Sequence, residues 1–418
     1  MLRKFLGDYS IDKRAFLVLT ILFLSVIGWF YMTLPMMNHI LDVLDPTHGE
    51  NLAIWAIFYI SLVAASIVGT FVSSKVSRLK FLYTWTIVGA IVSLLPIFVV
   101  NGDFSRISIL SLLLGSTFGL GVPTCLAYFT DYTVVENRGR IGGITLLIAN
   151  LSVPILAVLF NEIDFALVTL IFATLRGLGL VVFFQKPEKQ QAAEKKRDVS
   201  YMSILRDRTF MLYFVAWSMF PLVDRFESAL VVPYLTDAYA NGTLPNLLGI
   251  MDITEPVVAT ISLVIAGILC DWIGRKKIVL SGFVAIGAAY GIIGLIPQFE
   301  LSWYIYMVVD GIAWGIFLLI FFVIIWGDIA QSYKSVKYYT IGSIPYFLSS
   351  IVPTLLTQSF IDNVEVSAAF SVASFFLFVA VMPLVFAPET LPEKKMELRR
   401  LKSFAEEAQK MKEKYEEN

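Results

Sequence analysis

The chain of 418 residues is 57% hydrophobic and only 16% charged, and its mean hydropathy is +0.76. A soluble protein of this length carries about a quarter charged residues, so the composition excludes an ordinary soluble protein. The formal net charge of −1 gives no reason to expect a nucleic-acid partner. Cys125 and Cys270 both lie in or at the end of apolar blocks, and we expect neither a disulfide framework nor a metal site.

The apolar residues fall into blocks long enough to cross a bilayer, which takes about 20 residues each. The first runs from Ala15 to about Pro35; it is too long for a signal-peptide core, and no small-residue cleavage site follows it. The other eleven lie near 52–74, 81–100, 107–129, 141–160, 165–185, 210–235, 244–270, 277–297, 302–327, 338–358 and 365–386. We therefore predict an all-α integral membrane protein with twelve transmembrane helices.

A polar segment with the core EKQQAAEKKRD divides the blocks into six and six, and it is the expected linker between two domains. The predicted organisation is an N-terminal six-helix bundle (1–185), a cytoplasmic linker (186–208), a C-terminal six-helix bundle (209–392) and a charged cytoplasmic tail (393–418).

The positive charges predict the orientation of the chain. With twelve spans and an inside N-terminus, all Lys and Arg residues fall in the tails, the linker and the inner loops, except Arg106, Arg176 and Arg225. Because Lys and Arg are retained on the cytoplasmic side, we expect a multi-pass protein of the cell membrane with both termini in the cytoplasm.

The two sets of blocks also repeat. Two glycines twenty residues apart in spans 2 and 3 recur in spans 8 and 9, and the aspartates that close spans 4 and 10 stand at nearly the same offset. Two concordant landmarks indicate duplicated six-helix units, as in transporters built from parallel repeats. The matched residues are Gly69 with Gly267, Gly89 with Gly287, and Asp131 with Asp328.

The loop between spans 8 and 9 reads AGILCDWIGRKK, from Ala266 to Lys277. Gly267 allows close approach of a neighbouring helix, Asp271 ends the helix, and Gly274 supports a tight turn that Arg275 and Lys276 hold at the cytoplasmic interface. This resembles the Gly-x-x-x-Asp-x-x-Gly-Arg-Lys signature of the major facilitator superfamily at every diagnostic position. The resemblance covers residues 14–392 and implies two six-helix bundles, related by pseudo-twofold symmetry around a central cavity.

The equivalent loop of the first half departs from the family pattern. Ser73 stands where the family prefers Asp, and Val76 where it prefers Gly. In the family this loop helps to hold one state of the transport cycle. The departure leaves open how the N-terminal half closes at its inner face.

Two further segments resemble the sugar-porter and metabolite:proton symporter branches. TDYTVVENRGRIGG, between spans 4 and 5, supplies Asp131, Glu136 and Arg138, and APETLP follows span 12. We assign gating of the conformational change to these residues and to those of the loop after span 8. Span 5 lacks the Gly-Pro pair typical of drug/proton antiporters of the family, which disfavours a multidrug exporter.

Ionisable residues inside a bilayer are costly and usually face a cavity or a partner. The second half carries six of them at about 10–17 Å below its outer ends. Burial and repulsion between like charges both favour the protonated form of a carboxyl, so this layer predicts a proton-coupling or substrate site. Structural salt bridges between helices, or an outer vestibule filled with water, are the alternative. The residues are Asp224, Arg225, Glu227, Asp252, Glu255 and Asp310.

Helix geometry relates three of these residues. Asp224 and Glu227 share a helical face, whereas Arg225 points elsewhere and is placed to bridge to span 8. Pro256, directly after Glu255, frees a carbonyl about one turn earlier and kinks its helix.

Aromatic and amide side chains in cavity-lining spans suit a small organic substrate, although each also suits simple packing. The candidates are Trp29, Asn150, Trp217, Trp314 and Tyr346. Arg176 in span 6 is expected to have a partner within its own half or to reach toward the interface, and the alternative is an anion-binding role in the cavity.

By resemblance, the predicted function is secondary active transport of a sugar or organic acid by alternating access. We expect proton symport to drive it, and we expect no cofactor. The alternatives are a proton-coupled exporter of organic cations or drugs, a polytopic membrane enzyme, and a sensor that has lost transport. An enzyme is disfavoured because the sequence has no recognisable catalytic motif. The expected partners are a small-molecule substrate, protons and the lipid bilayer, and by family analogy the protein is a monomer.

Overall fold

The computed structural model describes residues 11–184, 197–330 and 333–391. Part of the predicted linker (186–196) and the predicted tail (393–418) lie outside these residues. Apart from one isolated bridge between Arg197 and Tyr333, the regular structure of the described residues is helical.

The first half contains six membrane spans. Their helices are α2 (Lys13–Phe23), η1 (Leu24–Gly28) and α3 (Trp29–Leu44) for span 1; α4 (His48–Lys75) for span 2; α5 (Arg78–Val92) and α6 (Pro96–Val99) for span 3; α7 (Phe104–Tyr132) for span 4; α8 (Arg138–Glu162) for span 5, after the short η2 (Val135–Asn137); and α9 (Phe165–Gly177) and η3 (Leu178–Phe184) for span 6.

The second half repeats this order. After the short α11 (Tyr201–Arg206) come α12 (Arg208–Ala240) for span 7; α13 (Leu247–Ile273) for span 8; α14 (Arg275–Leu295) for span 9; α15 (Glu300–Phe317), η4 (Leu318–Ile324) and α16 (Ile325–Ala330) for span 10; α17 (Val336–Ser349), α18 (Val352–Leu355) and α19 (Gln358–Asn363) for span 11; and α20 (Val366–Val379) and α21 (Val381–Phe386) for span 12.

All twelve predicted blocks fall in helices, and the fold prediction is confirmed. By length and composition alone, nine helical segments within the described ranges could cross a membrane. The other three blocks lie in α8, α12 and α17. Two of these helices are not long, uncharged apolar segments, for visible reasons. The middle of α12 carries three charged residues close together, and α17 has only 14 residues before its break.

Local sequence explains several helix starts. Thr47 and Glu50 form a capping box at α4: the Thr47 hydroxyl accepts from the Glu50 amide, and the Thr47 amide donates to the Glu50 carboxylate at 2.9 Å. The carboxylates of Asp103, Asp164 and Asp207 accept amide N–H groups at the starts of α7, α9 and α12. Each of these caps fixes where a span begins after a short loop.

The internal repeat is visible in the helix starts. α8 begins at Arg138 and α17 at Val336, which is 198 residues later, and α5 begins at Arg78 and α14 at Arg275, which is 197 residues later. These offsets match those of the sequence landmarks. Two pairs of helices thus repeat between the halves at nearly the same offset.

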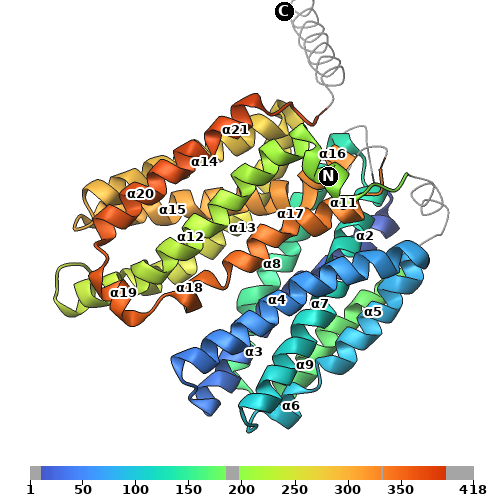
Figure 1. Ribbon diagram of the computed structural model, residues 1–418, viewed down its shortest axis with the longest axis horizontal. Helices are drawn as coiled ribbons and strands as arrows, with labels where there is room; N and C mark the ends of the chain where they lie inside the picture. The colour runs from blue at the N-terminus through green and yellow to red at the C-terminus, as the bar shows by residue number, and fades with distance from the viewer. Residues whose placement is uncertain (1–10, 185–196, 331–332, 392–418) are drawn as a thin grey trace, which may run out of the picture.

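The two halves lie side by side and form a V (Figure 1). Their ends near α11 and α16 lie together, whereas the far ends, at α19 and α20 of one half and at α3 and α6 of the other, lie apart. We call the first of these regions the closed end and define it by residues 133–140, 270–276 and 325–330.

Two helices contain a turn of π-helix near the middle of the molecule. One is η1 in span 1 and the other is η4 in span 10. Val26 and Ile27 of η1 and Leu318 and Phe322 of η4 line a pocket between the halves. The irregular turns thus border this pocket from both halves.

Candidate functional site

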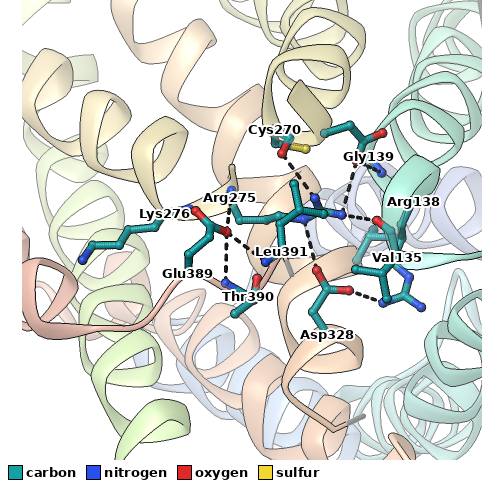
Figure 2. Close-up of polar contacts among 12 residues, drawn as sticks. Val135, Arg138, Gly139, Cys270, Arg275, Lys276, Asp328, Glu389, Thr390 and Leu391 are labelled. Carbon is teal, nitrogen blue, oxygen red and sulfur yellow. Dashed lines mark hydrogen bonds and ion pairs between the residues drawn. The ribbon is translucent and has the colours of Figure 1, made fainter. Parts of the chain in front are cut away.

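A buried network of charges joins the halves at the closed end (Figure 2). Asp328, whose side chain is fully buried, forms an ion pair with Arg138 of the first half and a second with Arg275, whose Nε lies 3.1 Å from its Oδ2. Arg275 also lies 3.2 Å from Asp271 and forms a hydrogen bond with the carbonyl of Val135 across the interface. Arg138 and Arg275 thus come from opposite halves and share one carboxylate.

Asp271 adds a second connection between the halves. Its two carboxylate oxygens accept the backbone N–H groups of Gly139 at 3.0 Å and of Arg140 at 2.9 Å, at the start of α8. A carboxylate at a helix N-terminus satisfies amides that have no partner within the helix and is favoured by the helix dipole. The aspartate of the loop signature therefore binds the opposite half directly.

Glycines allow α8 and α13 to come this close. A Cβ on Gly267 would lie 2.4 Å from the carbonyl oxygen of Gly139, and a Cβ on Gly139 would lie 2.5 Å from the Sγ of Cys270. The predicted close approach at Gly267 is confirmed, and its partner is a helix of the other half. Any side chain here must push the two halves apart.

The segment after span 12 closes the other side of this loop. Gly274 has φ +112°, which favours glycine, and the Glu389 carboxylate accepts the amides of Arg275 at 2.9 Å and Lys276 at 3.2 Å. The Lys276 Nζ donates to the carbonyl of Val385 at 2.7 Å. Glu389 therefore positions the start of α14 and, with it, the guanidinium of Arg275.

The remaining predicted gating residues lie at the same end. Asp131 forms an ion pair with Arg78 within the first half. Glu136 is buried, with 4% of its surface exposed, in the short η2 turn directly before α8. The sequence-derived gating set thus gathers at the closed end, where the halves meet.

Four of the five predicted acidic residues come together in the second half. Asp224, Glu227 and Asp310 are buried, with 5%, 1% and 2% of their surface exposed, and Glu255 is partly buried. These four carboxyl groups lie within range of mutual electrostatic interaction. Asp252 is exposed and lies one turn before Glu255, so it stands at the margin of the group. We call Asp224, Glu227, Glu255 and Asp310 the acidic cluster.

Few hydrogen-bond donors serve these carboxyls. One oxygen of Glu227 accepts the hydroxyls of Tyr306 at 3.1 Å and Tyr290 at 3.3 Å, and Asp224 accepts the indole N–H of Trp314 at 2.9 Å. Within the described residues, one buried oxygen each of Glu227, Glu255 and Asp310 has no hydrogen-bond partner. Because an unpaired buried charge is costly, such groups are suited to holding a proton.

Arg225 faces the interface between the halves. Its guanidinium carbon lies 5.4 Å from the ring centre of Trp314, and it interacts electrostatically with Asp224 and with three tyrosines, Tyr31, Tyr59 and Tyr346. Two of these tyrosines belong to the first half. Arg225 is therefore directed toward the first half, whereas the sequence predicts that it bridges to span 8.

The central pocket between the halves is aromatic. Tyr31 of span 1 and Tyr346 of span 11 meet across it, with 3.5 Å between their hydroxyl oxygens. Cys125 lies in its wall. The other side chains that line it are apolar: Phe23, Val26, Ile27, Phe30, Phe118, Val122, Leu126, Leu318, Phe322 and Phe347.

Of the predicted cavity residues, Tyr346 lines this pocket, and Trp314 lies between it and the acidic cluster. Trp217 is fully buried, stacks on Tyr346 and donates to the carbonyl of Gly342 at 2.8 Å. Asn150 donates to the carbonyl of Leu146 in its own helix at 2.9 Å. Trp29 is fully buried within the first half, where its indole N–H donates to Ser93 at 2.7 Å.

Arg176 is fully buried inside the first half, away from the lining of the central pocket. Its guanidinium carbon lies 3.8 Å from the ring centre of Trp85 and 5.6 Å from that of Trp29. Within the described residues none of its three side-chain nitrogens has a hydrogen-bond partner. Its aromatic partners lie within its own half, and the contact is of the cation–π type.

Sequence reasoning missed several residues of these sites. Asp328 entered only as a landmark of the repeat, although its equivalence to Asp131 already placed it at an inner loop. Tyr290 and Tyr306 gave no signal, because a tyrosine within an apolar helix reads as packing. Glu389 stood in the noted APETLP segment, but nothing in the sequence pointed to the amides that it accepts.

Comparisons with known proteins identify the family of the chain. The profile of the Major Facilitator Superfamily matches residues 16–230, more than half of the chain. No relative among curated protein sequences matches the chain.

Solved structures resemble nearly the whole fold. A structure of FucP in the outward conformation, 12% identical, gives a TM-score of 0.69 over 89% of this chain and 98% of that one. The human organic anion transporter MFSD10 (TETRAN), 14% identical, gives 0.66 over 89% and 99%. The proton:xylose symporter XylE, 14% identical, gives 0.62 over 90% and 96%. The chain belongs to the major facilitator superfamily: it is a multi-pass membrane protein and a secondary transporter of a small molecule, not an enzyme.

Proposed function

We propose that the protein is a proton symporter for a small organic acid with an apolar or aromatic body. The observation that carries this proposal is the placement of Arg225 between the aromatic central pocket and the acidic cluster. A guanidinium binds a carboxylate through paired hydrogen bonds, and the aromatic walls suit the rest of the molecule. The loop segments that resemble metabolite:proton symporters support the same reading.

A sugar fits this pocket less well. A hydroxyl-rich substrate loses affinity wherever one of its polar groups is buried without a partner. Apart from the hydroxyls of Tyr31 and Tyr346 and the thiol of Cys125, the described lining offers only hydrocarbon. Among the two substrate classes predicted from the sequence, the organic acid is therefore the better candidate.

The acidic cluster supplies the coupling in this proposal. With all four carboxyls ionised, the cluster and Arg225 would carry a formal charge of −3, which a buried site would hold only at high cost. Protons loaded from the open side reduce that charge and release Arg225 from Asp224, so that the guanidinium can receive the substrate carboxylate. Release of substrate and protons on the other side would restore the Arg225–Asp224 interaction.

We further propose that residues 1–185 and 209–392 are the two units that rock against each other, with 186–208 as their linker and 393–418 as a cytoplasmic tail. The distribution of Lys and Arg supports a cytoplasmic position for both termini and for the closed end, in the cell membrane. In that orientation, the described conformation opens to the outside. Family analogy supports a monomer.

Export of organic cations in exchange for protons is the second candidate. The surplus of acidic groups over Arg225 favours it, because the same carboxyls could bind a cation directly. The direction of proton movement separates the two functions.

The test is proton flux in liposomes that hold a pH-sensitive dye. Pooled organic acids, sugars and organic cations are added in turn to wild type, Arg225→Gln and Glu227→Gln. Glu300→Gln serves as the matched control, because Glu300 is an exposed residue in the first turn of α15. We expect acidification with organic acids that Arg225→Gln abolishes, and uptake without proton movement in Glu227→Gln.

Other outcomes would contradict parts of the proposal. Alkalinisation driven by cations would establish the exporter. Acidification driven by sugars alone would overturn the assignment of the substrate class. Uptake without proton movement in the wild type would mean that the acidic cluster is structural.

A further inference from the structure

A second pocket opens at the closed end, on the side opposite to α8 and α13. It lies between the end of α4 and the start of α5 in the first half and the start of α17 and the described end of the linker in the second. Its charged lining residues are Lys75, Arg78, Asp198, Lys334 and Lys337, and Ser73 also borders it. The pocket is polar, in contrast to the aromatic pocket at the centre.

Three of its charges are already engaged in ion pairs. Arg78 is paired with Asp131, and the Nζ of Lys337 lies 3.0 Å from Asp198. Partial burial raises the pKa of the Asp198 carboxyl, but hydrogen bonds from Lys337 and the Val199 amide lower it below its ordinary value, so Asp198 is charged. Among the described residues, Lys75 and Lys334 therefore leave a formal surplus of +2 in the pocket.

The internal repeat shows what is missing here. With the offset of 198, Ser73 corresponds to Asp271, and the start of α17 corresponds to the start of α8. On one side of the molecule, the Asp271 carboxylate fills the space between the halves and accepts two amides of α8. On the other side, the Ser73 hydroxyl donates to the carbonyl of Thr70 in its own helix at 3.0 Å.

The two sides of the closed end are thus joined differently. Glycines bring α8 against α13, whereas α4 meets α17 through the hydroxyls of Thr70 and Thr340, 2.6 Å apart. The pocket therefore carries surplus positive charge where the equivalent site has a carboxylate.

We propose that this pocket binds a phosphate-bearing anion, which takes the place of the missing carboxylate and holds the closed end together. A phosphate group carries the charge that Lys75 and Lys334 leave over and has several acceptor oxygens for ammonium and hydroxyl donors. Because these two lysines come from opposite halves, the bound anion stabilises the described conformation over one in which the halves separate here.

A lipid headgroup and a soluble phosphate share this chemistry. Lys75 lies 4.0 Å from the ring centre of Phe71, a residue that is 61% exposed on the outer surface of α4. The pocket thus lies next to apolar surface that faces the bilayer, within reach of an anionic headgroup. The experiment has one arm for each source.

The test uses the full-length protein and measures the alkylation rate of the native Cys270, which is fully buried at the closed end, in a Cys125→Ala background. One arm compares inorganic phosphate with chloride at matched ionic strength. The other compares nanodiscs of phosphatidylcholine with and without phosphatidylglycerol. The variants are Lys75→Gln/Lys334→Gln and Ser73→Asp, and the control is Lys80→Gln/Lys277→Gln, which removes two exposed lysines outside the pocket.

We expect the anion to slow alkylation in the wild type and in the control. The Lys75→Gln/Lys334→Gln variant should need about tenfold more anion for the same effect, which corresponds to about 1.4 kcal/mol. Ser73→Asp should be slow without any anion, because it restores a carboxylate at the position equivalent to Asp271. An effect of phosphatidylglycerol alone identifies a headgroup site, and an effect of phosphate alone identifies a soluble ligand.

Two results would overturn the proposal. One is a wild type whose alkylation rate responds to neither phosphate nor phosphatidylglycerol. The other is a Lys75→Gln/Lys334→Gln variant that responds as the control does, since the effect would then be general screening by ions. Because only the closed end is measured, neither result bears on proton coupling at the acidic cluster.

Discussion

Replacing Asp328 with Asn should open the closed end. The fully buried Asp328 carboxylate is the shared partner of Arg138 and Arg275, and without its charge two guanidiniums from opposite halves face each other. Breaking a buried ion pair by removing one partner costs about 3–5 kcal/mol. If this cost falls on the closed conformation alone, the equilibrium shifts toward separation by about 150- to 5,000-fold.

The native Cys270 can report this shift. Its side chain is fully buried against Gly139 in the closed conformation, so a thiol reagent reaches it only when the halves separate. In a Cys125→Ala background, Asp328→Asn should raise the alkylation rate by about 10²-fold or more, as long as opening stays faster than the chemical step. Asp131→Asn is the matched control, because the ion pair of Asp131 with Arg78 lies within the first half.

A folded Asp328→Asn variant that is alkylated as slowly as the wild type would refute this reasoning. The Asp328 network would then contribute to the stability of the fold without favouring one conformation. Equal acceleration by Asp131→Asn would also count against it, because the effect would not depend on contacts between the halves.

Three further predictions follow from the packing and the hydrogen bonds. Gly139→Ala should accelerate Cys270 alkylation and slow transport, because its Cβ would lie 2.5 Å from the carbonyl oxygen of Gly267 in the other half. Gly177→Ala is the control and should do neither, because the space around Gly177 is open. Arg176→Met should leave the thermal unfolding midpoint in detergent unchanged or raised, since it replaces a buried charge that has no hydrogen bond among the described residues with apolar volume; a large drop would show that its cation–π contacts with Trp85 and Trp29 outweigh the cost of burying the charge. Tyr306→Phe removes the hydrogen bond that Tyr306 donates to the Glu227 carboxylate. Because that bond favours the ionised form, its loss should move the pH profile of transport to higher pH. An unchanged profile would exclude Glu227 as the coupling group.

The fold could be predicted because it depends on features that are local in sequence. Blocks of apolar residues of bilayer length specify spans in a medium that offers no hydrogen bonds to the backbone. The glycine and aspartate of the loop after span 8 likewise carry their roles in their own chemistry: Gly267 lies against a helix backbone, and Asp271 accepts amides. What the sequence did not indicate is that both partners belong to the other half.

The candidate sites could be predicted only in part, because periodicity gives the face of a helix but not the neighbour of that face. Trp29 and Trp314 look alike in sequence, yet Trp29 donates to Ser93 inside the first half and Trp314 donates to Asp224 of the acidic cluster. Asp252 and Glu255 lie on one helical face, but only Glu255 is drawn into the cluster. Such differences depend on the rotation of whole helices, which long-range packing decides.

The π-helical turns η1 and η4 have a consequence for the aromatic pocket that they border. Such a turn accommodates one residue more than an α-helical turn does, and it can migrate along its helix or disappear. Each step of that kind rotates the neighbouring segment by about 100° without unwinding the span. If these turns became regular α-helix, spans 1 and 10 would exchange one set of pocket-facing side chains for another, a way of reshaping the binding surface that differs from rigid rocking of the halves.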